Sequence, residues 1–296
     1  MSLDQLNMLL AGMAANPPPQ GGPLELRTWF AAAHEPIPCP AGLEIVRVAA
    51  GPAGGDLITP PGAAKGGLII YYHGGGFVFG SSRTHRVVAG NLARAAGVAV
   101  LAADYRLAPE HPAPAAHDDA YSVYVWALEN GYSPERIALA GDSAGGNLAL
   151  ATAVRARDAG KPVPAALALM SPALDFAGEG ESYRTVDDDP IISPPLMELF
   201  LGCYLGGGDR RSPAVTPFAA DLAGLAPTLV HVGTRERLRD DAVTIVARLR
   251  AAGVPAELEI WEGMIHSMQI YAPMLDEGMA SVEAAAAFLR GHVERS

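Results

Sequence analysis

The pentapeptide Gly141–Gly145, with the sequence GDSAG, has the residue types and spacing of a serine nucleophile held in a tight turn. A short apolar run precedes it and an alanine-rich helical pattern follows it, which is the strand–turn–helix setting that such a nucleophile requires. The terminal glycines let the strand and the helix approach closely. Ser143 would then present its hydroxyl at a helix N-terminus, where free N–H groups favour developing negative charge. Asp142 lies on the turn beside it and is interpreted as structural.

A glycine-rich sequence, His73-Gly74-Gly75-Gly76, follows an apolar run that is typical of a buried strand. Attack of a serine on an ester produces an oxyanion, and loss of one N–H donor to that oxygen typically costs ~2.7–4 kcal/mol. Consecutive glycines allow the backbone to approach a substrate with its N–H groups pointing inward. Ala144, the residue after the nucleophile, is expected to supply a further N–H. His73 precedes the serine and is expected to order this loop by hydrogen bonding.

Eight histidines compete for the role of general base. His266 is the best placed, because it follows the last expected strand and precedes the last expected helix. It also follows the serine and the candidate acids, and the order serine, acid, histidine is typical of a nucleophile carried on a strand–turn–helix. His231 lies inside an apolar strand, where we expect a buried histidine with hydrogen-bond partners.

These motifs, together with the block Asp104–Glu110 (DYRLAPE), resemble the hormone-sensitive-lipase family of bacterial esterases within the α/β-hydrolases. The matching motifs occur in the right order between residues 68 and 267. The resemblance implies an eight-stranded sheet, a helical cap, cleavage of short-chain esters, and no metal or organic cofactor. It also implies that Gly75 and Gly76 line the oxyanion hole. The DYRLAPE block is interpreted as scaffolding in which Arg106 and Glu110 are spaced to pair across a turn.

The acid of the triad is expected in the segment 233–241, GTRERLRDD, which follows an apolar strand. The resembled esterases usually have D-P-L-x-D here, and the first aspartate is the acid. Alignment of Leu238 and Asp240 puts Glu236 at that position, with Arg237 in place of the proline. Glutamate can hold the histidine tautomer as aspartate does. Asp240 remains the alternative acid, although a capping or first-turn carboxylate also explains it.

The elements that position these residues alternate between strands and helices from about residue 43. Several strands are continuous apolar runs, which are typical of a parallel sheet covered on both faces. We therefore predict an α/β-hydrolase fold with a mostly parallel eight-stranded sheet flanked by helices. The first two strands have no helix between them and should pair antiparallel at one edge. The expected strands are 43–48, 56–59, 68–72, 98–102, 137–140, 166–170, 228–232 and 257–261, and the expected helices are 84–96, 115–130, 144–158, 238–252 and 273–290.

Two segments outside this alternation are predicted to form a cap. Residues 1–40 carry helical patterns at 3–14 and 23–33, and residues 41–296 form the catalytic domain. Within that domain, about 176–218 interrupts the alternation and is predicted to be a cap insertion. An insertion after the carboxyl end of a strand lies over the active face of such a sheet, and long loops in compact domains are usually functional.

The bulk composition narrows the function classes. Of the 296 residues, 50% are hydrophobic and 18% are charged, and the formal net charge is −11. This acidity disfavours nucleic acids and anionic membranes as partners. The two cysteines, Cys39 and Cys203, lie in no CxxC motif, so neither a metal site nor a disulfide is expected. No apolar run approaches the ~20 residues that span a membrane, and no secretory signal is apparent, so a cytoplasmic location is expected.

Three functions remain open at this point, besides cleavage of amides, which the same triad can also attack. The first is hydrolysis of short-chain carboxylic esters through an acyl-enzyme, with a small-molecule ester as the partner and a homodimer possible. The second is lactone hydrolysis, because the segment 264–275 resembles ε-lactone hydrolases of the same family. The third is non-catalytic ligand binding, as in plant gibberellin receptors, which lack the histidine. The cap phenylalanines Phe30, Phe176 and Phe200 predict a closed, modest pocket that favours acyl chains of about six carbons or fewer.

Overall fold

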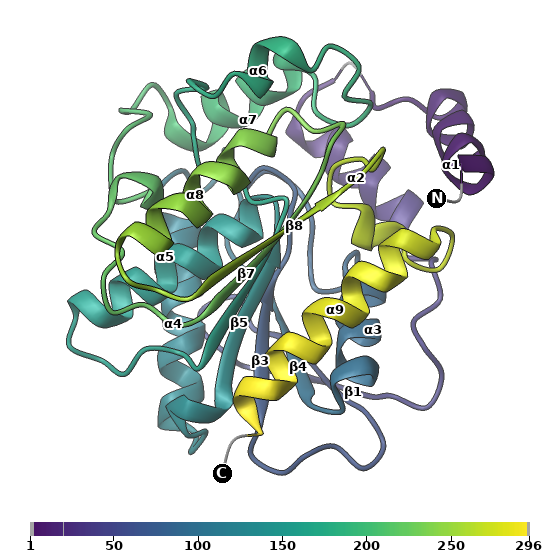
Figure 1. The fold of residues 1–296 in the computed structure, drawn as a ribbon. Helices are drawn as coiled ribbons and strands as arrows, with labels where there is room; N and C mark the ends of the chain where they lie inside the picture. Colours follow the sequence, from purple (N-terminus) through teal and green to yellow (C-terminus); the bar gives the residue numbers. More distant parts are fainter. Residues whose placement is uncertain (1–2, 20, 295–296) are drawn as a thin grey trace.

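The computed structural model describes residues 3–19 and 21–294 and contains one eight-stranded sheet (Figure 1). The strand order is β1-β2-β4-β3-β5-β6-β7-β8. All neighbours from β4 to β8 pair in parallel, whereas β2 is antiparallel to both β1 and β4. The predicted α/β-hydrolase sheet is therefore confirmed, including its antiparallel edge. The strands are β1 (Glu44–Val48), β2 (Gly55–Thr59), β3 (Leu68–Tyr72), β4 (Ala99–Ala103), β5 (Ile137–Asp142), β6 (Ala166–Met170), β7 (Thr228–Gly233) and β8 (Ala256–Trp261).

Helices cover both faces of this sheet. On one face α3 and α9 pack against each other, and α4, α5 and α8 cover the other face (Figure 1). The ends of the five expected helices in this domain differ from the observed ones by a few residues at most. The α-helices are α1 (Leu3–Ala15), α2 (Pro23–His34), α3 (Arg86–Ala96), α4 (Ala115–Glu129), α5 (Ala144–Asp158), α6 (Ser182–Thr185), α7 (Pro194–Leu205), α8 (Arg239–Ala251) and α9 (Asp276–Val293), and the 3₁₀ turns are η1 (Pro134–Arg136), η2 (Pro217–Ala219) and η3 (Met268–Tyr271).

Strand β3 shows why the central strands are continuously apolar. Its residues Ile69 and Tyr71 belong to the core cluster beneath α3 and α9. Leu68, Ile70 and Tyr72 belong to the cluster on the opposite face, with α4 and α5. Successive side chains of a strand point to opposite faces, so a strand buried on both sides needs an apolar residue at every position. The pairing of β3 with both neighbouring strands ends at Tyr72, where the glycine-rich loop begins.

The segments that lie outside the sheet gather at one end of the molecule. Helices α1, α2, α6 and α7 lie together at the top in Figure 1. This is the end at which β3 and β5 terminate, because the loop after β3 contacts Phe200 of α7. The described residues of the N-terminal segment, 3–19 and 21–40, and residues 176–218 thus meet over the carboxyl ends of the central strands.

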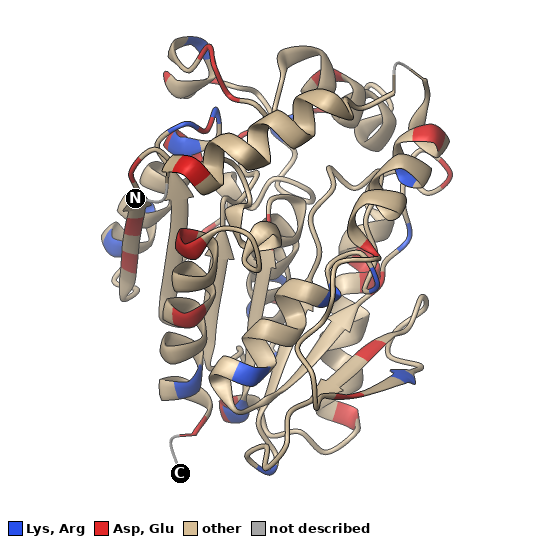
Figure 2. Cartoon of the chain, turned by 90° about the vertical axis from the view of Figure 1, so that its right-hand side faces the viewer, with Lys and Arg blue, Asp and Glu red and all other residues tan. Residues whose placement is uncertain are grey.

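Charged residues occur mostly on the helices and loops around the sheet (Figure 2). Acidic and basic residues are interspersed there rather than separated into two faces. None of the helices in the described part of the chain is long and apolar enough to cross a membrane. Within the same part, Cys39 and Cys203 are free and half-buried.

Candidate active site

Ser143 sits in a backbone turn that few residues tolerate. It joins β5 to α5 with φ 52° and ψ −118°, which is outside the usual regions for a residue with a side chain. The flanking glycines allow the tight approach: a Cβ on Gly145 would lie 1.9 Å from the Tyr72 carbonyl oxygen, and one on Gly141 would lie 2.4 Å from the Gly145 carbonyl carbon. The turn therefore depends on both glycines, and it sets Ser143 directly before the N-terminus of α5.

Asp142 ties the glycine-rich loop to this turn. Its Oδ1 accepts hydrogen bonds from the Gly74 amide at 2.8 Å and from the Tyr71 hydroxyl at 2.5 Å. The carboxyl is fully buried, and burial raises its pKa even though the Tyr71 hydrogen bond acts in the opposite direction. Since both of these bonds hold backbone or strand residues, Asp142 acts on the arrangement of the loop, as its interpretation from sequence expected.

The loop after β3 presents two further amides next to Ser143. Gly75 has φ 112° and Gly76 has φ 59°, and a Cβ would lie 2.3 Å from the Phe79 oxygen at Gly75 and 2.4 Å from the Phe200 ring at Gly76. Among the residues that the structure describes, the amides of Gly75, Gly76 and Ala144 have no hydrogen-bond acceptor. Three N–H donors near one serine can stabilise an oxyanion.

His73 holds the loop 73–76 in place through a hydrogen bond and a ring contact. Its Nδ1 lies 2.7 Å from the Gly74 carbonyl oxygen, and its ring stacks on Tyr105 with 4.1 Å between centroids. Burial, with a smaller contribution from His85, lowers the pKa of His73 to about 4. The imidazole is therefore neutral at ordinary pH and serves as a fixed hydrogen-bonding group.

His266 and Glu236 form a buried pair beside Ser143. The Nδ1 of His266 lies 2.8 Å from Oε2 of Glu236, while Oε1 of Glu236 accepts from the Ser171 hydroxyl and the Gly233 amide. A carboxylate only accepts, so Nδ1 carries the hydrogen and Nε2 is left free for the serine proton. Burial lowers the pKa of His266, but the hydrogen bond and charge of Glu236 outweigh it, so the pKa is raised overall.

Asp240, the alternative acid, is directed elsewhere. Its Oδ2 accepts from the Ser182 amide at 2.8 Å, at the start of α6, and its own amide donates to the Ser182 hydroxyl at 3.1 Å. The structure thus brings Glu236 to His266 and connects Asp240 to the segment above. His231 lies in the core, as expected, with its Nδ1 2.7 Å from the Ser281 hydroxyl.

One expected pair in the DYRLAPE block is wrong. Arg106 does not pair with Glu110; its guanidinium binds the buried Asp119 of α4 at 2.7 Å, and its amide donates to the same carboxylate. Glu110 instead binds Arg27 of α2 through two hydrogen bonds of 2.6 and 2.8 Å. The reason is that Asp119 would otherwise be a buried, unpaired charge, which is costly. The role of Arg27 has no signal in the sequence, because its partner is 83 positions away.

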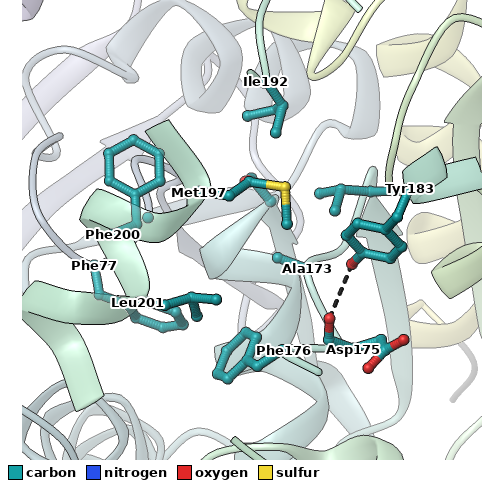
Figure 3. Close-up of a pocket in the computed structure, with 12 residues that line it drawn as sticks. Phe77, Ala173, Asp175, Phe176, Tyr183, Ile192, Met197, Phe200 and Leu201 are labelled. Atoms are coloured by element: carbon teal, nitrogen blue, oxygen red, sulfur yellow. Dashed lines mark hydrogen bonds between the residues drawn. The ribbon is translucent and has the colours of Figure 1, made fainter. Parts of the chain in front are cut away.

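Two cavities meet at Ser143. The first has a volume of about 50 Å³ and is walled mainly by apolar side chains, among them Phe77, Phe176 and Leu201 (Figure 3). The second, of about 70 Å³, contains His266 and is bordered by Phe30. Phe200 borders both, so the three phenylalanines expected around the pocket are divided between its two sides.

The wall of the first cavity rests on a buried carboxyl that the sequence did not reveal. Asp241 accepts hydrogen bonds from the amides of Leu174 and Asp175 at 2.7 and 2.8 Å, and the Tyr183 hydroxyl contacts it at 3.0 Å. Burial raises the pKa of Asp241 to about 7 despite these donors. In Figure 3 the same Tyr183 hydroxyl bonds to the Asp175 carbonyl, so the wall is fixed from behind.

Comparison with known proteins agrees with this geometry. A family model described as an alpha/beta hydrolase fold matches residues 69–270, and the chain belongs to that family. The chain is 43% identical over 231 residues to the "Acetyl-hydrolase" of Streptomyces hygroscopicus, covering 78% of this chain and 77% of that protein. It is 36% identical over 224 residues to "Esterase LipU" of Mycobacterium tuberculosis, covering 73% of this chain and 75% of that one.

Solved structures similar to this chain include esterases of one group within this family. An esterase from the bacterial hormone-sensitive lipase family matches with a TM-score of 0.94 and 40% identity, covering 98% of both chains. EstE5, soaked with p-nitrophenyl butyrate, matches with a TM-score of 0.92 and 35% identity, again over 98% of both chains. The resemblance found in the motifs is therefore confirmed. The protein is an enzyme of the esterase class, related to the bacterial hormone-sensitive lipase group.

Proposed function

We propose that the protein hydrolyses short-chain carboxylic esters with Ser143 as nucleophile, His266 as general base and Glu236 as the triad acid. The observation that carries this proposal is the 2.8 Å bond between His266 and Glu236, at a cavity that Ser143 also borders. The bond fixes the tautomer in which Nε2 can accept a proton. The amides of Gly75, Gly76 and Ala144 are the proposed oxyanion hole.

The reaction then follows from these positions. His266 Nε2 takes the proton of Ser143 as its Oγ attacks the ester carbonyl, and the amides stabilise the oxyanion. Collapse of the intermediate breaks the ester C–O bond, and His266 returns the proton to the leaving alcohol. Water, deprotonated by His266, attacks the carbonyl of the acyl-serine. The bond between the acyl carbon and Oγ of Ser143 then breaks, which releases the carboxylic acid, and His266 returns the proton to Oγ.

The two cavities support a division of the substrate. His266 must reach the leaving oxygen, so the alcohol belongs in the cavity that His266 borders and the acyl chain belongs in the other one. The acyl side is small, and its wall contains Phe77 and Phe176. We propose that residues 1–40 and 176–218 act as the cap that closes both sides. The name of the Streptomyces relative and the p-nitrophenyl butyrate soaked into EstE5 also favour short acyl groups.

A panel of p-nitrophenyl esters from C2 to C12 tests this function. Each buried methylene contributes ~0.8 kcal/mol, so kcat/KM should rise until about C4 to C6 and then fall when the cavity is full. Ser143→Ala should remove turnover and keep the melting temperature of the wild type. More than a few per cent residual activity in that folded variant would contradict the assignment of the nucleophile. An ε-lactone in the same panel tests the lactone alternative.

A further inference from the structure

The loop that carries Glu236 is fastened to the segment above it. The guanidinium of Arg237 donates to the Tyr183 carbonyl at 2.7 Å, and the Ser182 hydroxyl donates to the Arg237 carbonyl at 2.6 Å. Asp240 accepts from the Ser182 amide at 2.8 Å. Two residues that follow Glu236, Arg237 and Asp240, are therefore bonded to the beginning of the 182–189 segment.

Asp189 completes this connection with both carboxylate oxygens. Its Oδ2 accepts from the Arg237 amide at 2.9 Å, while its Oδ1 accepts from the amides of Ile191 and Ile192, also at 2.9 Å each. Arg237 stands where the resembled esterases carry proline, which has no amide hydrogen to donate. The bond to Asp189 is thus possible because this chain departs from that pattern.

The three amides that Asp189 holds belong to residues next to the reaction. Arg237 follows Glu236 directly in the chain. Ile192 borders both cavities at Ser143, and Ile191 borders the one that contains His266. We call residues 176–218, which lie above Ser143, the roof. The Asp189 carboxylate therefore binds both the roof and the loop that carries Glu236, the partner of His266.

We propose that Asp189 is a positioning residue for ester hydrolysis, which couples the roof above Ser143 to the Glu236–His266 pair. This inference rests on the proposed function. In the sequence, residues 187–189 are a run of three aspartates, and the proposal assigns a role to one of them, Asp189. Asp188 differs from its neighbour: it is exposed and forms an ion pair with Arg235 at 3.1 Å.

The charge of Asp189 also affects the pKa of His266. Burial lowers the pKa of His266, and the carboxylates of Glu236, Asp189 and Asp142 raise it. His85 borders the same cavity, but burial holds its pKa at about 3, so it adds no charge there. Activity requires neutral His266 and rises with pH through its pKa. Removal of the Asp189 charge should lower that pKa and move the acidic limb of the kcat/KM profile to lower pH.

The test compares Asp189→Asn with Asp188→Asn, which makes the same change of charge one position away. For Asp189→Asn we expect kcat/KM for p-nitrophenyl butyrate at its plateau to fall about tenfold, because misplaced catalytic groups lose rate steeply. Its acidic limb should move down by roughly half a unit. Asp188→Asn should change kcat/KM less than about twofold and leave the limb in place, since exposed ion pairs contribute little. If the two variants behave alike, the inference is overturned.

Asp189→Glu separates charge from position. It should keep the acidic limb of the wild type while kcat still falls, since the longer side chain cannot hold all three amides. Titration of His266 by NMR, assigned with His266→Gln, checks the shift of the pKa without any turnover. An unchanged His266 pKa in folded Asp189→Asn would overturn the electrostatic part. Failure of the proposed function is distinct, because the wild type itself would then hydrolyse none of the esters.

Discussion

The floor and the roof of the active site are held in place by different means. The floor consists of the turn 141–145 and the loop 73–76, where neighbouring atoms lie so close to the glycines that a Cβ is excluded there. The roof, residues 176–218, is held by side chains that bind main-chain amides and carbonyls, as at Asp189 and Arg237. The positions of Ser143 and of the loop amides therefore depend on close packing at the glycines of the floor. The shape of the substrate cavities depends on side chains of the roof, which can be replaced.

The largest effect should come from the Glu236–His266 pair, which lies beside the floor. Glu236→Gln should lower kcat by ~10⁴, as a neutral amide can select the wrong histidine tautomer. Asp240→Asn, which weakens only the bond to Ser182, should lower kcat by less than about tenfold. Steady-state kinetics on p-nitrophenyl butyrate would compare the two. If their order is reversed, the triad acid is Asp240 rather than Glu236.

The next largest effect is expected from a side chain added in the turn 141–145, where there is no room for one. In Gly145→Ala the added Cβ would lie 1.9 Å from the Tyr72 oxygen, so the strand and helix must separate. We expect the free energy of unfolding to fall by about 3 kcal/mol, measured by urea denaturation with an unchanged slope. A loss below ~1 kcal/mol would show that the floor yields as easily as ordinary surface positions do.

Substitutions in the roof should change the preference for acyl chain length. Phe176→Ala would enlarge the first cavity and admit about two more methylenes, at ~0.8 kcal/mol each. The ratio of kcat/KM for the octanoate to that for the butyrate should rise about tenfold. Phe30→Ala, on the histidine side, should leave this ratio unchanged. A change of ratio in Phe30→Ala alone would exchange the roles of the two cavities.

The smallest effect is expected at a glycine of the roof. A Cβ at Gly202, in the interior of α7, would meet nothing within 4 Å. Gly202→Ala should therefore stabilise the protein by about 0.5–1 kcal/mol, because alanine loses less backbone entropy in a helix. Thermal unfolding of this variant beside Gly145→Ala gives the direct contrast. A destabilised Gly202→Ala would mean that the roof is packed as tightly as the floor.

The same contrast explains what the sequence could reveal. The floor was predictable, because a positive φ or a close approach demands glycine at fixed spacing, and because two-sided burial makes β3 and β5 continuously apolar. The long-range bonds of the roof and of α2 left no such pattern. Arg27 and Glu110 are 83 positions apart, and Asp189 and Arg237 are 48 positions apart. The expected Arg106–Glu110 pair failed for this reason, because spacing in a turn could not reveal the buried Asp119.

The hydrogen bonds between buried or part-buried carboxylates and main-chain amides have an evolutionary consequence. Asp142, Asp189 and Asp241 each bind backbone N–H groups, which almost every amino acid supplies. The residues that Asp189 and Asp241 hold can therefore mutate while these hydrogen bonds persist, whereas Gly74 cannot, because a Cβ there would lie 2.2 Å from Oδ2 of Asp142. A lineage can exchange Ile191 or Ile192 and so acquire new substrates, while the machinery that attacks them is inherited intact.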